Sequence, residues 1–319
     1  MQLEFMASEQ PTQLNPARMP AAITDTGCER ELNEDRYAVI ESGSGVAWVV
    51  ADGMGGVSGG ELAAQLAIDA LRRHLETNTY RDVEGALRAA VLEANRVIVL
   101  RRQNPLFSGM GTTVVAAMFR GPRVVIAHAG DSRAYLVRDG VSHHLTLDHT
   151  LVQEMVSRGE LAVEEALDHP QSHVLTRCLG AEPGLQVDSA RYWVHRENGA
   201  GGSDKLVLAS DGLYSLVTDA ELALVVSDLD PQRACVHLVE LAKSRGGFDN
   251  ITVAVIPLEG TLREEPPPGM ERGLLGDDER ELERGAEEIN TKRLVAFWVV
   301  SSIATVMMTI LGVTVFFLS

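Results

Sequence analysis

The sequence predicts an α+β domain followed by one membrane-spanning helix. Short apolar runs joined by tight turns predict strands that pair antiparallel, because a parallel connection needs a long crossover. Stretches with apolar residues at helical spacing lie on both sides of these runs and predict helices that cover the outer faces of the sheets. The last apolar run, residues 294–318, contains no charged residue and is long enough to cross a bilayer.

Two helices are expected first. Residues 61–75 follow Gly59 and Gly60 and have apolar residues at helical spacing, and residues 83–100 repeat the pattern. Three strands then follow at 112–119, 123–128 and 133–138, and the last runs into Asp139-Gly140, a typical hairpin turn. Later helices are expected at 148–158, 219–226 and 231–244.

Four short acidic motifs lie at the edges of predicted strands. Asp52-Gly53 follows the apolar run 46–51, Ser210-Asp211-Gly212 follows 206–209, Asp249-Asn250 opens 251–256, and Asn33-Glu34-Asp35 lies near the N-terminus. Carboxylates at the ends of buried strands, next to glycines that let a ligand approach the backbone, suit a hard divalent cation held by oxygen atoms. Each motif alone is typical of a turn. Their joint occurrence therefore carries the prediction of a metal site.

Composition and charge narrow the class of protein. The 319 residues carry a formal charge of −17, from 45 acidic and 28 basic residues, which argues against nucleic acid as a partner because that binding needs clustered Lys and Arg. Three widely spaced cysteines, Cys28, Cys178 and Cys235, fit a reducing compartment without a disulfide framework.

The chain divides into four parts. Residues 1–20, which have no signal-peptide pattern, are expected to be a disordered lead-in, and residues 21–257 are expected to be the folded domain. Residues 258–293 are rich in Glu, Asp, Arg, Pro and Gly and indicate a solvated linker. Lys292 and Arg293 precede the apolar run 294–318, so the positive-inside rule predicts a single-pass cell-membrane protein, in contact with inner-membrane lipid, whose domain faces the cytoplasm.

Six motifs occur in one order between about residues 22 and 256. They are Arg30-x-x-Asn33-Glu34-Asp35, Val50-Ala51-Asp52-Gly53-Met54-Gly55-Gly56, Gly109-Met110-Gly111-Thr112-Thr113, Ala129-Gly130-Asp131-Ser132-Arg133-Ala134-Tyr135, Leu208-Ala209-Ser210-Asp211-Gly212 and Phe248-Asp249-Asn250-Ile251-Thr252. In this order they resemble the bacterial metal-dependent Ser/Thr protein phosphatases, the PPM or type-2C family. The resemblance implies two packed antiparallel β-sheets flanked by α-helices, a four-layer αββα arrangement.

The resemblance also implies a centre with two divalent cations, Mn²⁺ or Mg²⁺. Asp52 is the expected bridging ligand. Asp211 and Asp249 would complete one metal site, while Glu34 and the Gly53 carbonyl would complete the other. By the same resemblance, Asp35 and Asn250 orient metal-bound waters, and Arg30 binds the phosphoryl group, since a planar guanidinium can hold two of its oxygens.

Two metals suit the chemistry of phosphate monoesters, which resist hydrolysis strongly. Cations about 3.5–4 Å apart lower the pKa of a bridging water and clamp the phosphoryl oxygens. The resemblance therefore implies hydrolysis of phosphoserine and phosphothreonine on proteins. Expected partners are phosphorylated proteins, a eukaryotic-like Ser/Thr kinase and the targets of that kinase.

Two positions depart from the family pattern. Many eukaryotic members have a histidine where this chain has Met54, so no side-chain proton donor for the leaving group is evident. A third metal is often seen between the residues equivalent to Asp131 and Asp211, but a carboxylate that often accompanies them is replaced by Ser215. A third site is left open.

The histidines are predicted to be surface or hydrogen-bonded side chains and not metal ligands. His169 and His173 lie between residues 161 and 179, where relatives carry a mobile flap beside the metal site. The others considered are His128, His143, His144 and His149.

A second hypothesis is a catalytically weak, membrane-bound, phosphatase-like module that only binds a partner. It predicts that at least one metal carboxylate is missing, whereas Glu34, Asp52, Asp211 and Asp249 are all present. Hydrolysis of p-nitrophenyl phosphate with and without Mn²⁺ separates the two hypotheses.

Overall fold

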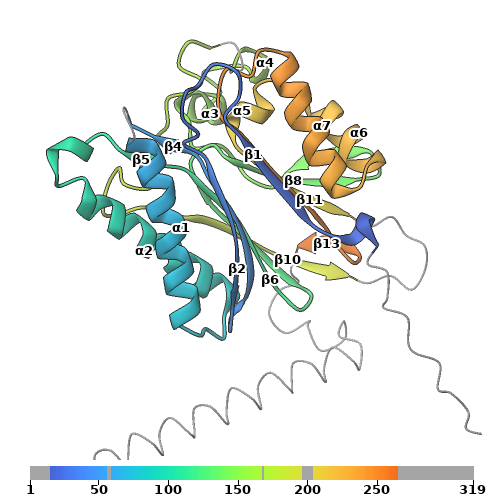
Figure 1. The fold of residues 1–319 in the computed structure, drawn as a ribbon, viewed down its shortest axis with the longest axis horizontal. Helices are drawn as coiled ribbons and strands as arrows, with labels where there is room; N and C mark the ends of the chain where they lie inside the picture. Colours follow the sequence, from blue (N-terminus) through green and yellow to red (C-terminus); the bar gives the residue numbers. More distant parts are fainter. Residues whose placement is uncertain (1–14, 56–58, 167–168, 196–203, 265–319) are drawn as a thin grey trace, which may run out of the picture. The chain divides into compact units, whose positions relative to one another are not determined.

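The computed structural model describes residues 15–55, 59–166, 169–195 and 204–264, in which two antiparallel sheets pack face to face (Figure 1). One sheet has six strands in the order β13-β10-β7-β6-β3-β2: Thr261–Glu264, Asp188–His195, Arg123–Ala129, Val114–Arg120, Gly45–Ala51 and Arg36–Ser42. The other has five in the order β1-β12-β11-β8-β9: Ala21–Asp25, Ile251–Pro257, Lys205–Ala209, Arg133–Arg138 and Val141–His144. A short pair, β4 (Gly53–Met54) and β5 (Gly111–Thr112), lies apart from both sheets.

Helices cover both outer faces. Helices α1 (Gly59–Thr77) and α2 (Val83–Arg101) share a hydrophobic core with the six-stranded sheet. Helices α5 (Asp211–Tyr214), α6 (Asp219–Asp228) and α7 (Pro231–Ser244) share another with the five-stranded sheet. Figure 1 shows α1 and α2 on one side of the strands and α6 and α7 on the other. The expected arrangement of two antiparallel sheets flanked by helices is therefore confirmed.

The central strands are apolar on both faces because each face meets a different layer. In β3 and β6, Val49 and Ala116 belong to the core beneath α1 and α2, while their neighbours Val50 and Val115 belong to the core between the sheets. Period-two alternation thus distributes one apolar run between two cores. This explains why these strands appear in the sequence as continuous apolar runs.

Side-chain caps set several helix boundaries. The expected helix 148–158 begins at Leu151, because Thr150 Oγ1 accepts a hydrogen bond from the backbone N of Gln153 and caps the first turn. The predicted helix 231–244 is observed with these bounds, preceded by the cap Asp230. The remaining short elements are η1 (Pro16–Arg18), η2 (Pro105–Phe107), α3 (Leu151–Ser157) and α4 (Val163–Ala166).

The predicted end of the domain at residue 257 is too early. Strand β13 lies within the range assigned to the linker, pairs with β10, and buries Leu262 between the sheets together with Leu258. Asp204 fastens this segment, because its buried carboxylate accepts hydrogen bonds from Arg138 and from the backbone N of Leu262, both at 2.5 Å. The folded unit therefore extends through Glu264, and its edge strand is short and polar, which a composition argument does not detect.

Several predictions fall outside the described residues. The lead-in is described only from Asn15, and the rest of the linker and the proposed membrane helix 294–318 lie beyond residue 264. Among the described residues, no helix is both long and apolar enough to cross a membrane.

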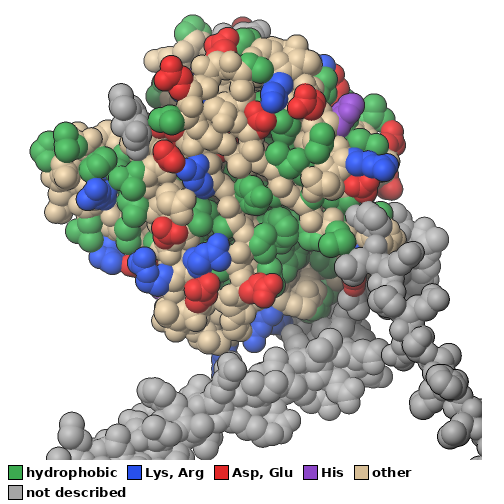
Figure 2. All heavy atoms as spheres, viewed as in Figure 1, with side chains coloured by type: hydrophobic (Ala, Val, Ile, Leu, Met, Phe, Trp, Pro, Cys, Tyr) green, Lys and Arg blue, Asp and Glu red, His purple; other side chains and the backbone are tan. Residues whose placement is uncertain are grey.

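Acidic and basic side chains are intermixed on the face drawn in Figure 2. Opposite charges one turn apart on a helix also form ion pairs, as Arg96 and Glu93 of α2 do at 2.7 Å. Pairs of this kind lie in water and contribute little to stability. Several carboxylates of the cleft, by contrast, are buried close to one another.

Candidate active site

A cleft of about 480 Å³ opens where loops from both sheets meet. Its walls come from the loop between β1 and β2, the end of β3 with β4, the turn between β7 and β8, the start of α5 and the residue pair before β12. The lining residues are Arg30, Glu31, Leu32, Glu34, Asp52, Gly53, Met54, Gly55, Thr113, Asp131, His173, Leu175, Asp211 and Asp249.

The cleft contains every residue expected to bind a metal. Glu34, Asp52, Gly53, Asp211 and Asp249 line it, as do Asp131, the residue of the open third site, and Arg30. Ser215, which follows α5, is exposed and does not line the cleft. The structure thus brings the candidate ligands together, while their assignment as ligands stays a prediction.

Glycines allow the close approaches on which the cleft depends. A Cβ atom at Gly53 would lie 2.1 Å from the carbonyl oxygen of Gly60 and 2.7 Å from that of Glu34. A Cβ at Gly60 would lie 2.7 Å from Glu34 Oε1. Any side chain at these positions would therefore push the Glu34 loop, β4 and the start of α1 apart.

Two threonines hold Asp52 in place and divide the predicted strand 112–119. The backbone carbonyl of Asp52 accepts hydrogen bonds from Thr112 Oγ1 and from the backbone N of Thr113, both at 2.8 Å. Thr113 Oγ1 accepts one from the backbone N of Asp52 at 3.1 Å and lies 2.6 Å from Ser132 Oγ. Thr113 therefore leaves the strand ladder between β5 and β6 and links Asp52 to the turn that carries Asp131.

The cleft carboxylates crowd one another in a buried environment. Burial, followed by the neighbouring carboxylates, raises the pKa of Asp52 well above its usual range and also raises that of Asp211. Burial raises the pKa of Asp131 to about 7, with the Asp211 carboxylate adding to the effect. Within the described part of the chain, the buried Asp211 Oδ1 has no hydrogen-bond partner.

These observations fit divalent cations. A buried carboxylate oxygen without a donor is costly unless a cation or proton satisfies it. Carboxylates and a glycine carbonyl are the oxygen ligands that Mg²⁺ and Mn²⁺ prefer. The residues present thus match the predicted metal centre in both charge and ligand type.

Arg30 lies at the mouth of the cleft. Its guanidinium donates a hydrogen bond to Asp249 Oδ2 at 2.7 Å, and half of its side chain is exposed. Pairing with a cleft carboxylate aims the guanidinium at the site, and its five N–H donors exceed what one carboxylate oxygen uses. Arg30 therefore lines the cleft beside a candidate metal ligand, while its role in binding a phosphoryl group stays a prediction.

Asp35 and Asn250 both bond to protein groups, and their expected role in orienting metal-bound water stays a prediction. Asn250 Oδ1 accepts from the backbone N of Glu34 at 2.7 Å, and its Nδ2 donates to the carbonyls of Thr26 and Leu32, both at 2.9 Å. The amide is thus used by backbone groups and fastens the Glu34 loop. Neither residue lines the cleft.

The Asp35 carboxylate lies behind the cleft wall. It is buried and accepts a hydrogen bond from Ser210 Oγ at 2.7 Å, and Ser210 Oγ in turn accepts one from the backbone N of Thr252 at 2.9 Å. Burial raises the pKa of Asp35 to about 7. Its position links the loop before β2 to the strand end that presents Asp211.

Several residues that line the cleft were not predicted as site residues from the sequence. Thr113 and Leu175 line the cleft, and so does His173, which was predicted to be a surface histidine within the flap range. Met54, which the sequence analysis did consider, also lines the cleft. Only the position of Thr113 within a recognised motif could have suggested its role, because Leu175 lies in an ordinary apolar run.

The fold and the acidic cleft together define a metal-dependent hydrolase of phosphate esters. Residues 29–239 match the protein phosphatase 2C family, a range that covers more than half of the chain. The chain is 38% identical over 248 residues to the serine/threonine phosphatase stp of Listeria monocytogenes, covering 75% of this chain and 96% of the relative.

Solved structures of related phosphatases have the same fold as this chain. The chain resembles the serine/threonine phosphatase PstP/Ppp of Mycobacterium tuberculosis with a TM-score of 0.66 and 38% identity, over 76% of this chain and 98% of that one. A structure of the PstP catalytic domain in complex with two manganese ions gives a TM-score of 0.63 and 35% identity, over 74% and 96% of the two chains. This chain belongs to the protein phosphatase 2C family.

Proposed function

We propose that this protein is a metal-dependent phosphatase that removes phosphate from phosphoserine and phosphothreonine of other proteins. The observation that carries the proposal is the convergence of Arg30 and five candidate metal-ligand carboxylates in one cleft, although the chain separates Glu34 from Asp249 by more than two hundred residues. The relatives described above are serine/threonine phosphatases, which supports the substrate class.

The proposed centre takes two Mn²⁺ or Mg²⁺ ions. When bound, such ions supply a nucleophile at neutral pH and neutralise charge on the phosphoryl oxygens. Asp52, Asp211, Asp249, Glu34 and the Gly53 carbonyl would hold them. The manganese ions in the related PstP structure support this choice of metal.

The protein's own groups set how the substrate lies. Arg30 binds phosphoryl oxygens at the mouth and so directs the phosphorus toward the carboxylates. Thr112, Thr113 and Ser132 keep the Asp52 backbone from shifting, which preserves the spacing that catalysis needs. Met54 adds an apolar wall and offers no proton to the leaving alcohol.

We also propose that the phosphatase opposes a eukaryotic-like Ser/Thr kinase at the cytoplasmic face of the cell membrane. The uncharged run 294–318, preceded by Lys292 and Arg293, supports a membrane anchor in contact with lipid. Full-length protein should remain in the membrane fraction after carbonate extraction. Release by carbonate would contradict the anchor but leave the phosphatase proposal intact.

The activity test uses purified full-length protein with p-nitrophenyl phosphate and a phosphothreonine peptide. Turnover of both is expected with Mn²⁺ or Mg²⁺, and loss of turnover is expected with a chelator. If no metal restores hydrolysis of either substrate, the protein is a phosphatase-like binding module instead.

A further inference from the structure

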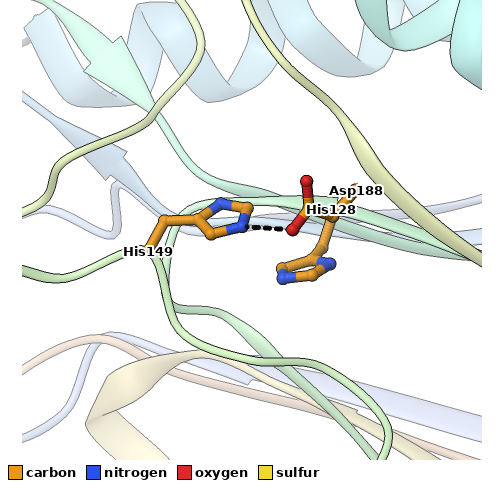
Figure 3. A group of neighbouring side chains, drawn as sticks. All are labelled: His128, His149 and Asp188. Atoms are coloured by element: carbon orange, nitrogen blue, oxygen red, sulfur yellow. Dashed lines mark hydrogen bonds and ion pairs between the residues drawn. The ribbon is translucent and has the colours of Figure 1, made fainter. Parts of the chain in front are cut away.

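Three neighbouring side chains, His128, His149 and Asp188, form a group (Figure 3). The group adjoins the turn that carries Asp131, because His149 bonds to Gly130. The two histidine rings are buried and stack with their centroids 4.5 Å apart. His149 Nε2 lies 3.1 Å from Asp188 Oδ2. The cleft function described above uses none of these residues.

The ligand atoms of the three side chains lie within 4.8 Å of one another, as in some metal sites. The hydrogen bonds argue against a metal. The backbone N–H of Gly130 donates to His149 Nδ1 at 3.1 Å, so that nitrogen is unprotonated and the proton lies on Nε2, which faces Asp188. A metal at Nε2 would require an imidazolate or the loss of the Gly130 bond.

The same bonds suit a role in positioning. His149 is joined to Gly130 twice, because its backbone N also donates to the Gly130 carbonyl at 3.0 Å. Gly130 has a φ of +115°, and a Cβ there would lie 2.6 Å from Thr113 Cβ. Thr113 on one side and His149 on the other therefore hold the backbone next to Asp131.

Asp188 connects this arrangement to the segment 150–176, which supplies His173 and Leu175 to the cleft. One carboxylate oxygen accepts from His149, at the start of the segment, and the other accepts from Arg177, just after its end, at 2.8 Å. The backbone N of Thr176 also donates to the His149 carbonyl at 2.8 Å. His149 thus joins both ends of this segment to the Asp131 turn.

We propose that His149, oriented by Asp188, is a positioning residue that sets the Asp131 carboxylate for cation binding. The proposal rests on the proposed function, because it treats Asp131 as a ligand. Asp188 accepts a hydrogen bond from Nε2–H, which leaves Nδ1 free to accept one from the Gly130 N–H and so keeps the turn in place.

The test compares His149→Phe with His128→Phe in the full-length protein. Both replace a buried ring of the same stack, but only His149 bonds to Gly130, whereas His128 Nε2 donates to the Leu147 carbonyl at 2.9 Å. We expect His149→Phe to raise the Mn²⁺ concentration for half-maximal hydrolysis of p-nitrophenyl phosphate by about tenfold, and His128→Phe by less than about twofold. Calorimetric Mn²⁺ titration without substrate should show weaker binding only in His149→Phe.

Combination with Asp131→Ala separates positioning from general destabilisation. If His149 acts through Asp131, the double variant should have the same Mn²⁺ requirement as Asp131→Ala alone. Additive effects, or equal changes in His149→Phe and His128→Phe, would overturn the proposal. An unmutated protein with no metal-dependent turnover would instead contradict the proposed function.

If His149→Phe does not fold, Asp188 provides the second test. Asp188→Ala should raise the Mn²⁺ requirement, because His149 loses the acceptor that selects its tautomer. Asp188→Asn should have a Mn²⁺ requirement close to that of the unmutated protein, since an amide oxygen can still accept a hydrogen bond from Nε2–H. An unchanged requirement in Asp188→Ala would overturn the proposal.

Discussion

At the level of single residues, Asp211 carries a buried carboxylate oxygen that no protein donor satisfies among the described residues. Its side chain is surrounded by other carboxylates. Such a group gains more from a cation than an exposed carboxylate does, because burial weakens solvent screening.

We therefore expect Asp211→Asn to weaken metal binding severely and to lower kcat by several orders of magnitude, with partial recovery at high Mn²⁺. Calorimetry and a Mn²⁺ titration of activity measure both effects. Asp219→Asn is the control, because it removes the same charge from an exposed carboxylate that pairs with His144 outside the cleft. Equal losses in the two variants would show that net charge, and not the cleft position, controls metal binding.

Arg30 should behave differently from the metal ligands. Arg30→Ala leaves the cleft carboxylates in place but removes a charge-assisted contact of about 1.5–3 kcal/mol, which corresponds to a loss of roughly 10- to 150-fold in kcat/KM. A contact that is equal in the ground and transition states would change KM alone, and one that tightens would also lower kcat.

The matched control for Arg30 is Arg96→Ala, since Arg96 is also an exposed arginine paired with a carboxylate, but on α2. Steady-state kinetics with a phosphothreonine peptide at saturating Mn²⁺ measure the difference. An unchanged kcat/KM in Arg30→Ala would show that this guanidinium is only a surface charge.

At the level of elements, strand β13 is the part of the fold that composition arguments place wrongly. It adds an edge to the six-stranded sheet and buries Leu262, while Asp204 joins it to Arg138 of β8. A chain ending at residue 258 would therefore lose a paired strand and leave part of the core between the sheets exposed.

We expect a chain ending at residue 258 to melt at a lower temperature than one ending at residue 264, although both keep every cleft residue. Losing a buried leucine typically costs about 2–5 kcal/mol, before the loss of strand pairing is counted. Leu262→Ala in the longer chain isolates the core contribution, and thermal unfolding measures all three. Equal melting temperatures would show that β13 is dispensable.

At the level of the whole molecule, the cleft carboxylates couple stability to pH. The pKa of Asp35 and that of Asp131 are raised to about 7 in the folded protein. A carboxyl whose pKa is raised in the folded state stabilises that state at low pH, where it is protonated. This contribution to stability is lost as the pH rises toward the pKa of the folded state. Burial lowers the pKa of His149 to about 4, which opposes this trend below about pH 6.5.

Metal-free protein should accordingly lose stability, by about 1 kcal/mol, between pH 6.5 and 7.5. Mn²⁺ should restore it, because a ligand that binds only the folded state stabilises that state. Thermal unfolding in a chelator, with and without excess Mn²⁺, measures this, and Asp131→Asn should reduce the pH dependence. Stability that rises with pH in the chelator would contradict the crowding of these carboxylates.

Local patterns determined much of this protein from the sequence. Helix and strand periodicity depends on neighbouring residues, so the ranges 231–244 and 133–138 could be assigned without tertiary information. The motif residues Asp52 and Asp211 could be selected because a carboxylate beside a glycine at a strand end is itself a local pattern.

Tertiary structure alone decided the features that depend on contacts between distant segments. Asn250 belongs to a motif, yet its role in fastening the Glu34 loop follows from bonds to residues more than two hundred positions away. Strand β13 exists because β10 offers a free edge, and the buried role of His149 follows from its bonds to Gly130 and Asp188. Hydrogen bonding and burial act through space, whereas a single sequence records only the order of residues along the chain.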